Sequence, residues 1–125
     1  KYYQELAHLP GVYFMPELEN TLSNRWLTAL TINEAEAGVS VRDVLLALTE
    51  ENIEARPVWK PLHMQPIFQG TKYYPHSKSK NISEYLFENG ICLPSGSNMT
   101  DEDQIRIINC IKETLSLANG RKRCV

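Results

Sequence analysis

Three prolines fall within residues 56–66 of this chain, in the run Arg-Pro-Val-Trp-Lys-Pro-Leu-His-Met-Gln-Pro. Each proline lacks a backbone N–H and disfavours helical geometry in the residue before it, so a regular helix does not fit here. The run nevertheless carries Arg56, Trp59, Lys60 and His63, which are costly side chains for a simple spacer. Because loops on a rigid scaffold often carry functional groups, we interpret this segment as a loop shaped to line a pocket.

These side chains have structural explanations as well as functional ones. His63 lies between Pro61 and Pro66, so its backbone is constrained. Its imidazole can bind a ligand or form a hydrogen bond within the loop, and the sequence leaves both possibilities open. Trp59 can stack on a flat ligand, although filling the core is the favoured interpretation. Arg56 can hold an anion through two N–H groups or pair with a structural carboxylate.

The rest of the chain predicts short strands that alternate with helices. Turn and capping signals bound helices at residues 1–8, 40–52, 82–89 and 100–119, and apolar runs indicate strands at 12–15, 26–32, 53–58 and 91–93. Residues 34–38 are expected to form a polar connection, and Gly90 to end the third helix in a left-handed conformation. The pattern predicts one α/β domain with a three- to four-stranded, mixed or antiparallel sheet and helices packed on one face.

Two features of this pattern concern the site and the core. Asn24 and Arg25 directly precede the predicted strand at 26–32, where they can face the same pocket as the proline-rich loop or simply form the start of a strand.

The last predicted helix should bury one apolar stripe. The residues of that stripe are Ile105, Ile108, Ile111 and Leu115.

Composition excludes several classes of protein. A net charge of -2 argues against a nucleic-acid-binding face, and no apolar run approaches membrane-spanning length. The three cysteines are an odd number without a CxxC pair, which fits reduced thiols in a cytoplasmic protein. The three histidines, His8, His63 and His76, lack the spacing of metal ligands, so no metal site is expected.

Four ordered blocks of sequence carry a resemblance to a known family. They are Ser-Asn-Arg-Trp-Leu-Thr at 23–28, the proline-rich run extended to Ile-Phe at 56–68, Gly-Ile-Cys-Leu-Pro-Ser-Gly at 90–96, and Met-Thr-Asp-Glu-Asp-Gln at 99–104. In this order they resemble the C-terminal part of the DegT/DnrJ/EryC1/StrS family of pyridoxal-phosphate-dependent sugar aminotransferases. The resemblance runs from about Tyr2 to Leu115. It implies that residues 1–125 are the small C-terminal domain of a fold type I enzyme, a fragment without the large cofactor-binding domain.

The resemblance also implies a distribution of roles. Pyridoxal 5'-phosphate would be bound mainly by the missing domain, which carries the Schiff-base lysine in this family. The lysines near the loop (Lys60, Lys72, Lys78 and Lys80) do not lie in that lysine's motif, so no catalytic residue is expected in the fragment, which should be inactive alone. His63 matches a family histidine near the sugar and cofactor pocket. Arg56 and Trp59 match the same loop block, and Asn24 and Arg25 match the block that precedes the strand.

The implied reaction is a transamination in two half-reactions. An amino group would pass from glutamate to a 4-keto nucleotide sugar, for surface polysaccharide or glycan biosynthesis, in a parent enzyme that is a homodimer. Two other hypotheses compete with this one. The chain could be an autonomous small α/β binding module without catalysis, or an enzyme of another kind that uses His63 directly as a general base.

Overall fold

The computed structural model describes residues 1–24, 26–75, 77 and 81–122. Along the described chain the helices and strands are α1 (Tyr2–Leu6), β1 (Val12–Phe14), β2 (Thr28–Ile32), α2 (Glu34–Ala37), α3 (Val41–Glu50), β3 (Arg56–Pro57), the 3-10 turns η1 (Leu62–Met64) and η2 (Pro66–Phe68), α4 (Ile82–Asn89), β4 (Gly90–Leu93) and α5 (Asp101–Lys122). The predicted α/β class is confirmed, and every predicted helix and strand is present; the bounds of α4 match the prediction, and the other elements have shifted ends.

The sheet has four strands in the order β1-β2-β4-β3, and every pair of neighbours is antiparallel. The register places Leu30 of β2 opposite Phe14 of β1 and Ile91 of β4. Because side chains alternate between the two faces of a strand, Leu30, Ile32 and Ile91 share one face. All three are at most 4% exposed, so this face is the core face of the sheet.

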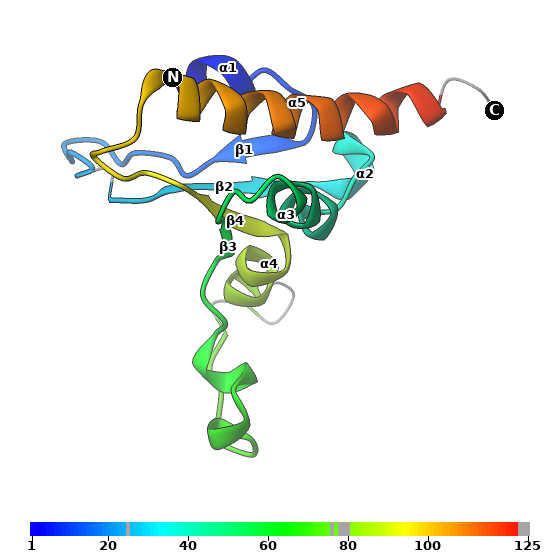
Figure 1. Ribbon diagram of the computed structural model, residues 1–125. Helices are drawn as coiled ribbons and strands as arrows, with labels where there is room; N and C mark the ends of the chain where they lie inside the picture. Colours follow the sequence, from blue (N-terminus) through cyan, green and yellow to red (C-terminus); the bar gives the residue numbers. More distant parts are fainter. Residues whose placement is uncertain (25, 76, 78–80, 123–125) are drawn as a thin grey trace.

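Three helices cover the core face of the sheet (Figure 1). α5 contacts α1 and α3, and α3 also contacts β4. Leu6 of α1 and Leu48 of α3 are 0% exposed, and Ile108 of α5 is 3% exposed. The apolar stripe of each helix therefore meets the apolar face of the sheet, and burial of these side chains is the main source of stability.

The helix α4 lies on the other face of the sheet. It contacts β2, β3 and β4, and its Leu86 lines a shallow hollow together with Tyr13, Ala29 and Thr31. Those three residues alternate with the core residues of β1 and β2, so they point away from the core. The prediction that the helices pack on one face therefore holds for α1, α3 and α5 but is wrong for α4.

Several local predictions need correction. Residues 34–37 form the short helix α2, because the Asn33 side chain accepts the N–H of Ala35 and caps it. In α5 the buried stripe contains Ile107, while Ile105 is 47% exposed. The helix also continues past the predicted end at 119, to Lys122.

Gly90 differs from its predicted role as well. Its backbone is extended, with φ −100° and ψ 141°, and it is the first residue of β4. A Cβ atom at Gly90 would lie 2.2 Å from the Leu86 carbonyl oxygen and 2.5 Å from Val58 Cγ2. The position therefore needs glycine for space, because α4 turns directly into β4 and lies against it.

Two capping boxes begin α3 and α5. In the first, Asp43 N–H donates to Ser40 Oγ (3.2 Å) and Ser40 N–H donates to Asp43 Oδ2 (2.9 Å). Thr100 and Asp103 repeat this arrangement at 3.1 and 3.0 Å. The hydroxyls of Ser40 and Thr100 also donate to Asp43 Oδ2 and Asp103 Oδ2, at 2.7 and 2.8 Å. The hydroxyl and backbone N–H of Ser40 lower the pKa of Asp43, and the backbone N–H and hydroxyl of Thr100 lower the pKa of Asp103, because these donors stabilise the ionised carboxylates.

The lowered pKa values predict a loss of stability in acid. Such carboxylates stabilise the fold above the unfolded aspartate pKa of about 3.9, and this contribution is lost as pH falls below that value through the folded pKa. We expect the urea midpoint of the wild-type chain to fall between pH 5 and pH 3. The Asp43→Asn and Asp103→Asn double variant should fall less steeply over the same range. An equal slope in both proteins would contradict this account.

Candidate functional site

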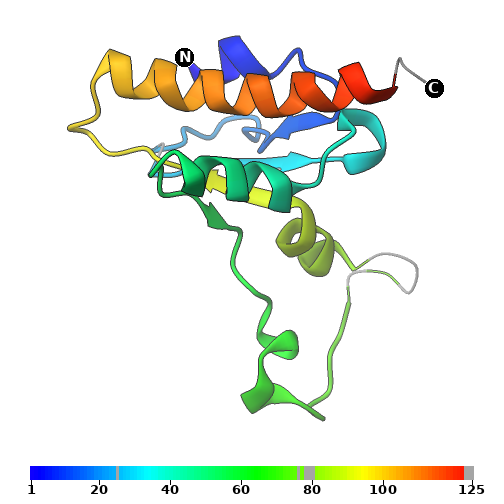
Figure 2. The ribbon, with the colours of Figure 1, turned by 45° about the vertical axis from the view of Figure 1, so that its right-hand side comes forward.

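The proline-rich segment forms an arm that projects from the body of the domain (Figures 1 and 2). We define the arm as residues 59–75, between β3 and the approach to α4. Pro61 precedes η1 and Pro66 begins η2, so the prolines limit the arm to two single 3-10 turns. The arm exposes apolar side chains to solvent, with Ile67 82% exposed and Tyr74 81% exposed. The prediction of an irregular loop is confirmed.

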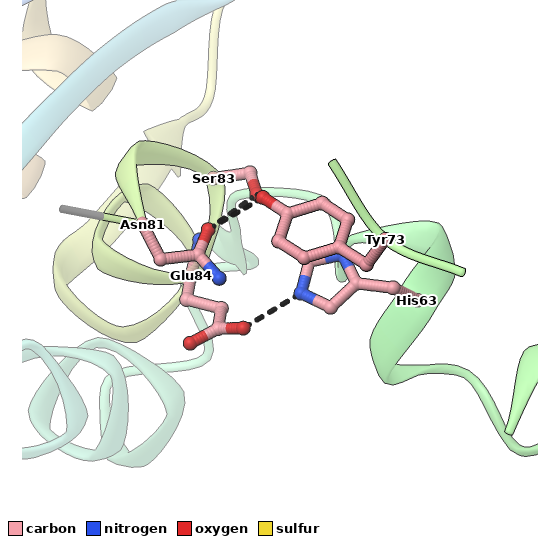
Figure 3. Close-up of polar contacts among 5 residues, drawn as sticks. All are labelled: His63, Tyr73, Asn81, Ser83 and Glu84. Carbon is pink, nitrogen blue, oxygen red and sulfur yellow. Dashed lines mark hydrogen bonds and ion pairs between the residues drawn. The ribbon is translucent and has the colours of Figure 1, made fainter. Parts of the chain in front are cut away.

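His63 connects the arm to α4. Its Nε2 atom lies 2.7 Å from Glu84 Oε1, and Glu84 belongs to the first turn of α4. The imidazole also stacks on the Tyr73 ring, with centroids 3.6 Å apart and planes at 19° (Figure 3). Only 16% of the His63 side chain is exposed. The outgoing and returning parts of the arm therefore meet at this histidine.

Tyr73 connects the returning part of the arm to the same end of α4. Its hydroxyl donates to Asn81 Oδ1 (2.7 Å) and lies 3.1 Å from Ser83 Oγ. Asn81 is also the N-cap of α4, and its side chain accepts the N–H of Glu84. We call His63, Tyr73, Asn81, Ser83 and Glu84 the clasp, because together they fix both parts of the arm to one helix end (Figure 3).

The clasp engages only one nitrogen of the imidazole. Glu84 is the hydrogen-bond partner of Nε2, whereas Nδ1 has no partner among the described residues. An imidazole nitrogen without a proton is an acceptor and one with a proton is a donor, so Nδ1 is available to a ligand in either form. The local hydrogen bond that the sequence left open is thus present, and it leaves part of His63 free for a further contact.

Trp59 does not fill the core. It is 63% exposed and lies beside Trp26, which is 70% exposed, with ring centroids 6.0 Å apart and planes at 35°. The favoured core interpretation of Trp59 was therefore wrong. The contact joins the loop block at 56–68 to the block at 23–28, so these two distant parts of the sequence share one surface.

Exposure of the tryptophan pair predicts that truncating Trp59 has a small effect on stability. A fully buried tryptophan costs about 3–5 kcal/mol when replaced by alanine. For Trp59→Ala we expect a cost of about 1 kcal/mol, the usual worth of an aromatic pair beyond its buried area. Urea denaturation measures the difference. A cost above about 3 kcal/mol would show that the side chain is packed.

The other predicted residues have structural partners. Arg56 Nη2 lies 2.5 Å from Glu54 Oε1, and both side chains are 76% exposed. Asn24 Oδ1 accepts the N–H of Trp26 at 3.1 Å, which stabilises the turn before β2. Arg25 lies outside the described residues. Of the predicted site residues, Trp59 therefore meets the block at 23–28 through Trp26, and His63 joins a cluster that the sequence did not reveal.

The residues of the clasp were missed for a physical reason. Glu84 lies 21 residues after His63, and an acidic residue in the first turn of a helix is fully explained by the helix dipole. Tyr73 lies in a polar, aromatic loop with no periodic pattern. The available signal was the Asn81 cap, which fixes where α4 begins and so where the arm must return.

The surroundings of the described lysines bear on where pyridoxal phosphate could be held. Such a cofactor is held by a lysine as a Schiff base. Lys1 pairs with Asp101 at 2.6 Å and Lys112 with Glu5 at 2.5 Å, while Lys60 and Lys72 are exposed. Within the described ranges, no group of three or more His, Cys, Asp or Glu residues could hold a metal ion, and no helix is long and apolar enough to cross a membrane.

Comparison with known proteins places these features in one family. The model of the DegT/DnrJ/EryC1/StrS aminotransferase family matches residues 1–112. A Bacillus subtilis (strain 168) protein described as a pyridoxal phosphate-dependent aminotransferase, EpsN, is 51% identical over 111 residues, which cover 89% of this chain and 28% of EpsN. GDP-perosamine synthase of Vibrio cholerae is 33% identical over 112 residues, which cover 89% of this chain and 29% of the synthase.

The fold agrees with the sequence matches. The structure of DesI, determined in the presence of its TDP-sugar product, superposes with a TM-score of 0.80 at 25% identity, over 98% of this chain and 30% of DesI. The chain spans less than a third of the length of the relatives that it matches. The neighbouring structures are aminotransferases of fold type I, as predicted. The chain belongs to the DegT/DnrJ/EryC1/StrS aminotransferase family.

Proposed function

We propose that this chain is the C-terminal domain of a pyridoxal-phosphate-dependent enzyme that transfers an amino group from glutamate to a 4-keto nucleotide sugar. The product would serve surface polysaccharide or glycan biosynthesis. The observation that carries the proposal is the 51% identity to EpsN over 89% of this chain. The names of GDP-perosamine synthase and of the DesI complex with a TDP-sugar support a nucleotide sugar as the substrate class.

The arm suggests how this domain takes part. It projects from the body (Figure 2), and it exposes Leu62, Ile67 and Tyr74 by 64%, 82% and 81%. In the proposal it reaches toward the pocket of the large domain and presents His63, with Arg56 and Trp59 at its base. Asn24 and Arg25 are proposed to border the same pocket.

The chemistry itself belongs to the remainder of the parent enzyme. Pyridoxal phosphate acts as an electron sink when it is bound, and in the proposal the remainder of the parent supplies most of its site. We assign no catalytic residue to this chain, and we expect the chain alone to be inactive. The proposed parent is a cytoplasmic homodimer. The role of this domain is to close the pocket and to orient the sugar. Holding the sugar in the reactive orientation lowers the activation free energy of the amino transfer.

The full-length parent provides the direct test. It should transfer ¹⁵N from labelled glutamate to a 4-keto sugar linked to GDP, TDP or UDP, which mass spectrometry of the nucleotide-sugar product detects. The 125-residue chain should transfer none under the same conditions. Failure of the parent to label any of these sugars would contradict the proposal. A parent without any lysine that borohydride links to the cofactor would instead favour a binding module.

A further inference from the structure

Glu84 has a geometry that its position in a helix does not require. A carboxylate in the first turn of a helix satisfies the helix dipole without a partner side chain. Glu84 instead directs Oε1 to His63 Nε2 at 2.7 Å, across 21 residues of sequence. The contact is partly shielded from water, since the side chains of His63 and Glu84 are 16% and 37% exposed. A hydrogen bond to a charged group in such a place is stronger than one between neutral groups.

The contact bears on which nitrogen of the imidazole carries the proton, because the donor and acceptor roles follow the tautomer. An ionised carboxylate only accepts hydrogen bonds, so Nε2 must be the donor. In the neutral imidazole, Nδ1 is then the nitrogen with the lone pair. No described residue donates to Nδ1 or accepts from it. The stack on Tyr73 holds the plane of the ring, so the direction of that lone pair is fixed as well.

Tyr73 is itself held in place, which makes the arrangement rigid. Its hydroxyl donates to Asn81 Oδ1, and Asn81 caps the helix that carries Glu84. The Tyr73 ring stacks on His63 and the Glu84 carboxylate bonds to it, and both groups are therefore held in place by the first turn of α4. Figure 3 shows the histidine between these two contacts. Such support is what a group needs when it must meet a ligand in one orientation.

We propose that Glu84 is a positioning residue: it holds His63 as the Nε2–H tautomer, so that Nδ1 accepts a hydrogen bond from a hydroxyl of the sugar substrate. The proposal rests on the proposed function, because it takes His63 to border the sugar pocket. It extends the proposed function by naming the atom that contacts the sugar, Nδ1, and the sugar group that it binds, a hydroxyl. A hydroxyl-bearing sugar donates to Nδ1, whereas a sugar without a hydroxyl at that position leaves the nitrogen unpaired and should bind less well.

The tautomer can be observed directly in the full-length parent. The protein is labelled only at histidine with ¹⁵N, the His63 signals are assigned from the spectrum of His63→Asn, and two-bond ¹H–¹⁵N correlations are recorded at pH 8, where ordinary imidazoles are neutral. We expect the Nε2–H form in the wild type. Glu84→Gln should shift His63 toward the Nδ1–H form, because the amide can donate to Nε2. A wild type in the Nδ1–H form, or a Glu84→Gln spectrum equal to that of the wild type, would overturn the proposal.

A second measurement tests the consequence for the sugar. Glu84→Gln should lower kcat/KM for the keto-sugar by about tenfold, as expected when an acceptor for a substrate hydroxyl is lost. The first half-reaction with glutamate should be unchanged. Glu88→Gln is the matched control, because Glu88 is an exposed residue one turn further along α4, and it should behave as wild type in both measurements. An altered tautomer with unchanged kcat/KM would overturn the role of Nδ1.

The two measurements also separate this proposal from the proposed function. If the wild-type parent aminates no keto-sugar, the proposed function fails and the assignment of a sugar hydroxyl to Nδ1 fails with it. If the parent is active and the tautomer does not respond to Glu84→Gln, only the positioning role of Glu84 fails.

Discussion

Replacing Gly90 with alanine is expected to destabilise the chain by about 3 kcal/mol, the upper part of the range for overpacking a well-packed site. The backbone at Gly90 is extended, a conformation that alanine adopts without strain. The cost comes from space, because a Cβ atom would lie 2.2 Å from the Leu86 carbonyl oxygen and 2.5 Å from Val58 Cγ2. A backbone oxygen inside a helix cannot move without displacing that helix, so α4 must separate from β4. Urea denaturation of both proteins measures the change.

Gly70→Ala is the matched control for this experiment. Gly70 has φ +83°, which strains any residue with a Cβ, but no atom lies within 4 Å of the position that the Cβ would occupy. Its replacement should cost about 1 kcal/mol, from backbone conformation alone. The comparison separates the requirement for space from the requirement for positive φ. If Gly90→Ala costs no more than Gly70→Ala, the close packing of α4 on β4 is not a source of stability.

The two glycines show what a sequence can and cannot predict. A glycine after a helix usually ends it in a left-handed conformation, and this rule led to the wrong prediction for Gly90. Gly90 is instead the extended first residue of β4, and its carbonyl oxygen accepts the N–H of Val58, a residue 32 positions earlier, in a contact that no local pattern contains. The same limitation applies to α4. Its amphipathic pattern predicts that one side is buried, but it does not say against which face of the sheet.

Local signals performed well where local forces determine the structure. Ser40 with Asp43 and Asn81 with its own helix are capping patterns that act within four residues, and both helices begin where these patterns place them. The three prolines predicted an irregular segment, because their effect is on their own backbone. By contrast, the exposed pair of Trp26 and Trp59 depends on how two loops meet. The residues next to each tryptophan in the sequence therefore did not predict its exposure.

The residues of the candidate site also differ in whether the sequence alone could identify them. His63 could be selected from the sequence, because its flanking prolines constrain it and an imidazole is chemically versatile. Its partners could not, since Glu84 and Tyr73 reach it only after the arm has turned back. The arm must return to α4 at Asn81, and this return brings the carboxylate to the imidazole. The role proposed for the histidine thus depends on a contact that only the folded chain supplies.

Replacing His63 with alanine in the full-length parent is expected to lower kcat/KM for the keto-sugar by about 100-fold, or about 2.7 kcal/mol. The variant would lose the proposed contact with the sugar, and it also removes the hydrogen bond to Glu84 and the stack on Tyr73 that hold the arm. His8→Ala is the control, because His8 lies in the turn after α1 and outside the clasp. Steady-state assays with varied keto-sugar give the ratio. Activity of His63→Ala within twofold of the wild type would remove His63 from the site.

Two amide variants then distinguish the roles of the two nitrogens. The amide of asparagine lies near the position of Nδ1, and the longer glutamine places its amide near Nε2. His63→Gln should keep the bond to Glu84 and hold the arm, yet lose the acceptor for the sugar. His63→Asn should keep an acceptor near Nδ1 and lose the bond to Glu84. If Nδ1 contacts the sugar, His63→Asn retains the higher kcat/KM of the two, whereas His63→Gln retains the higher value if His63 only fastens the arm.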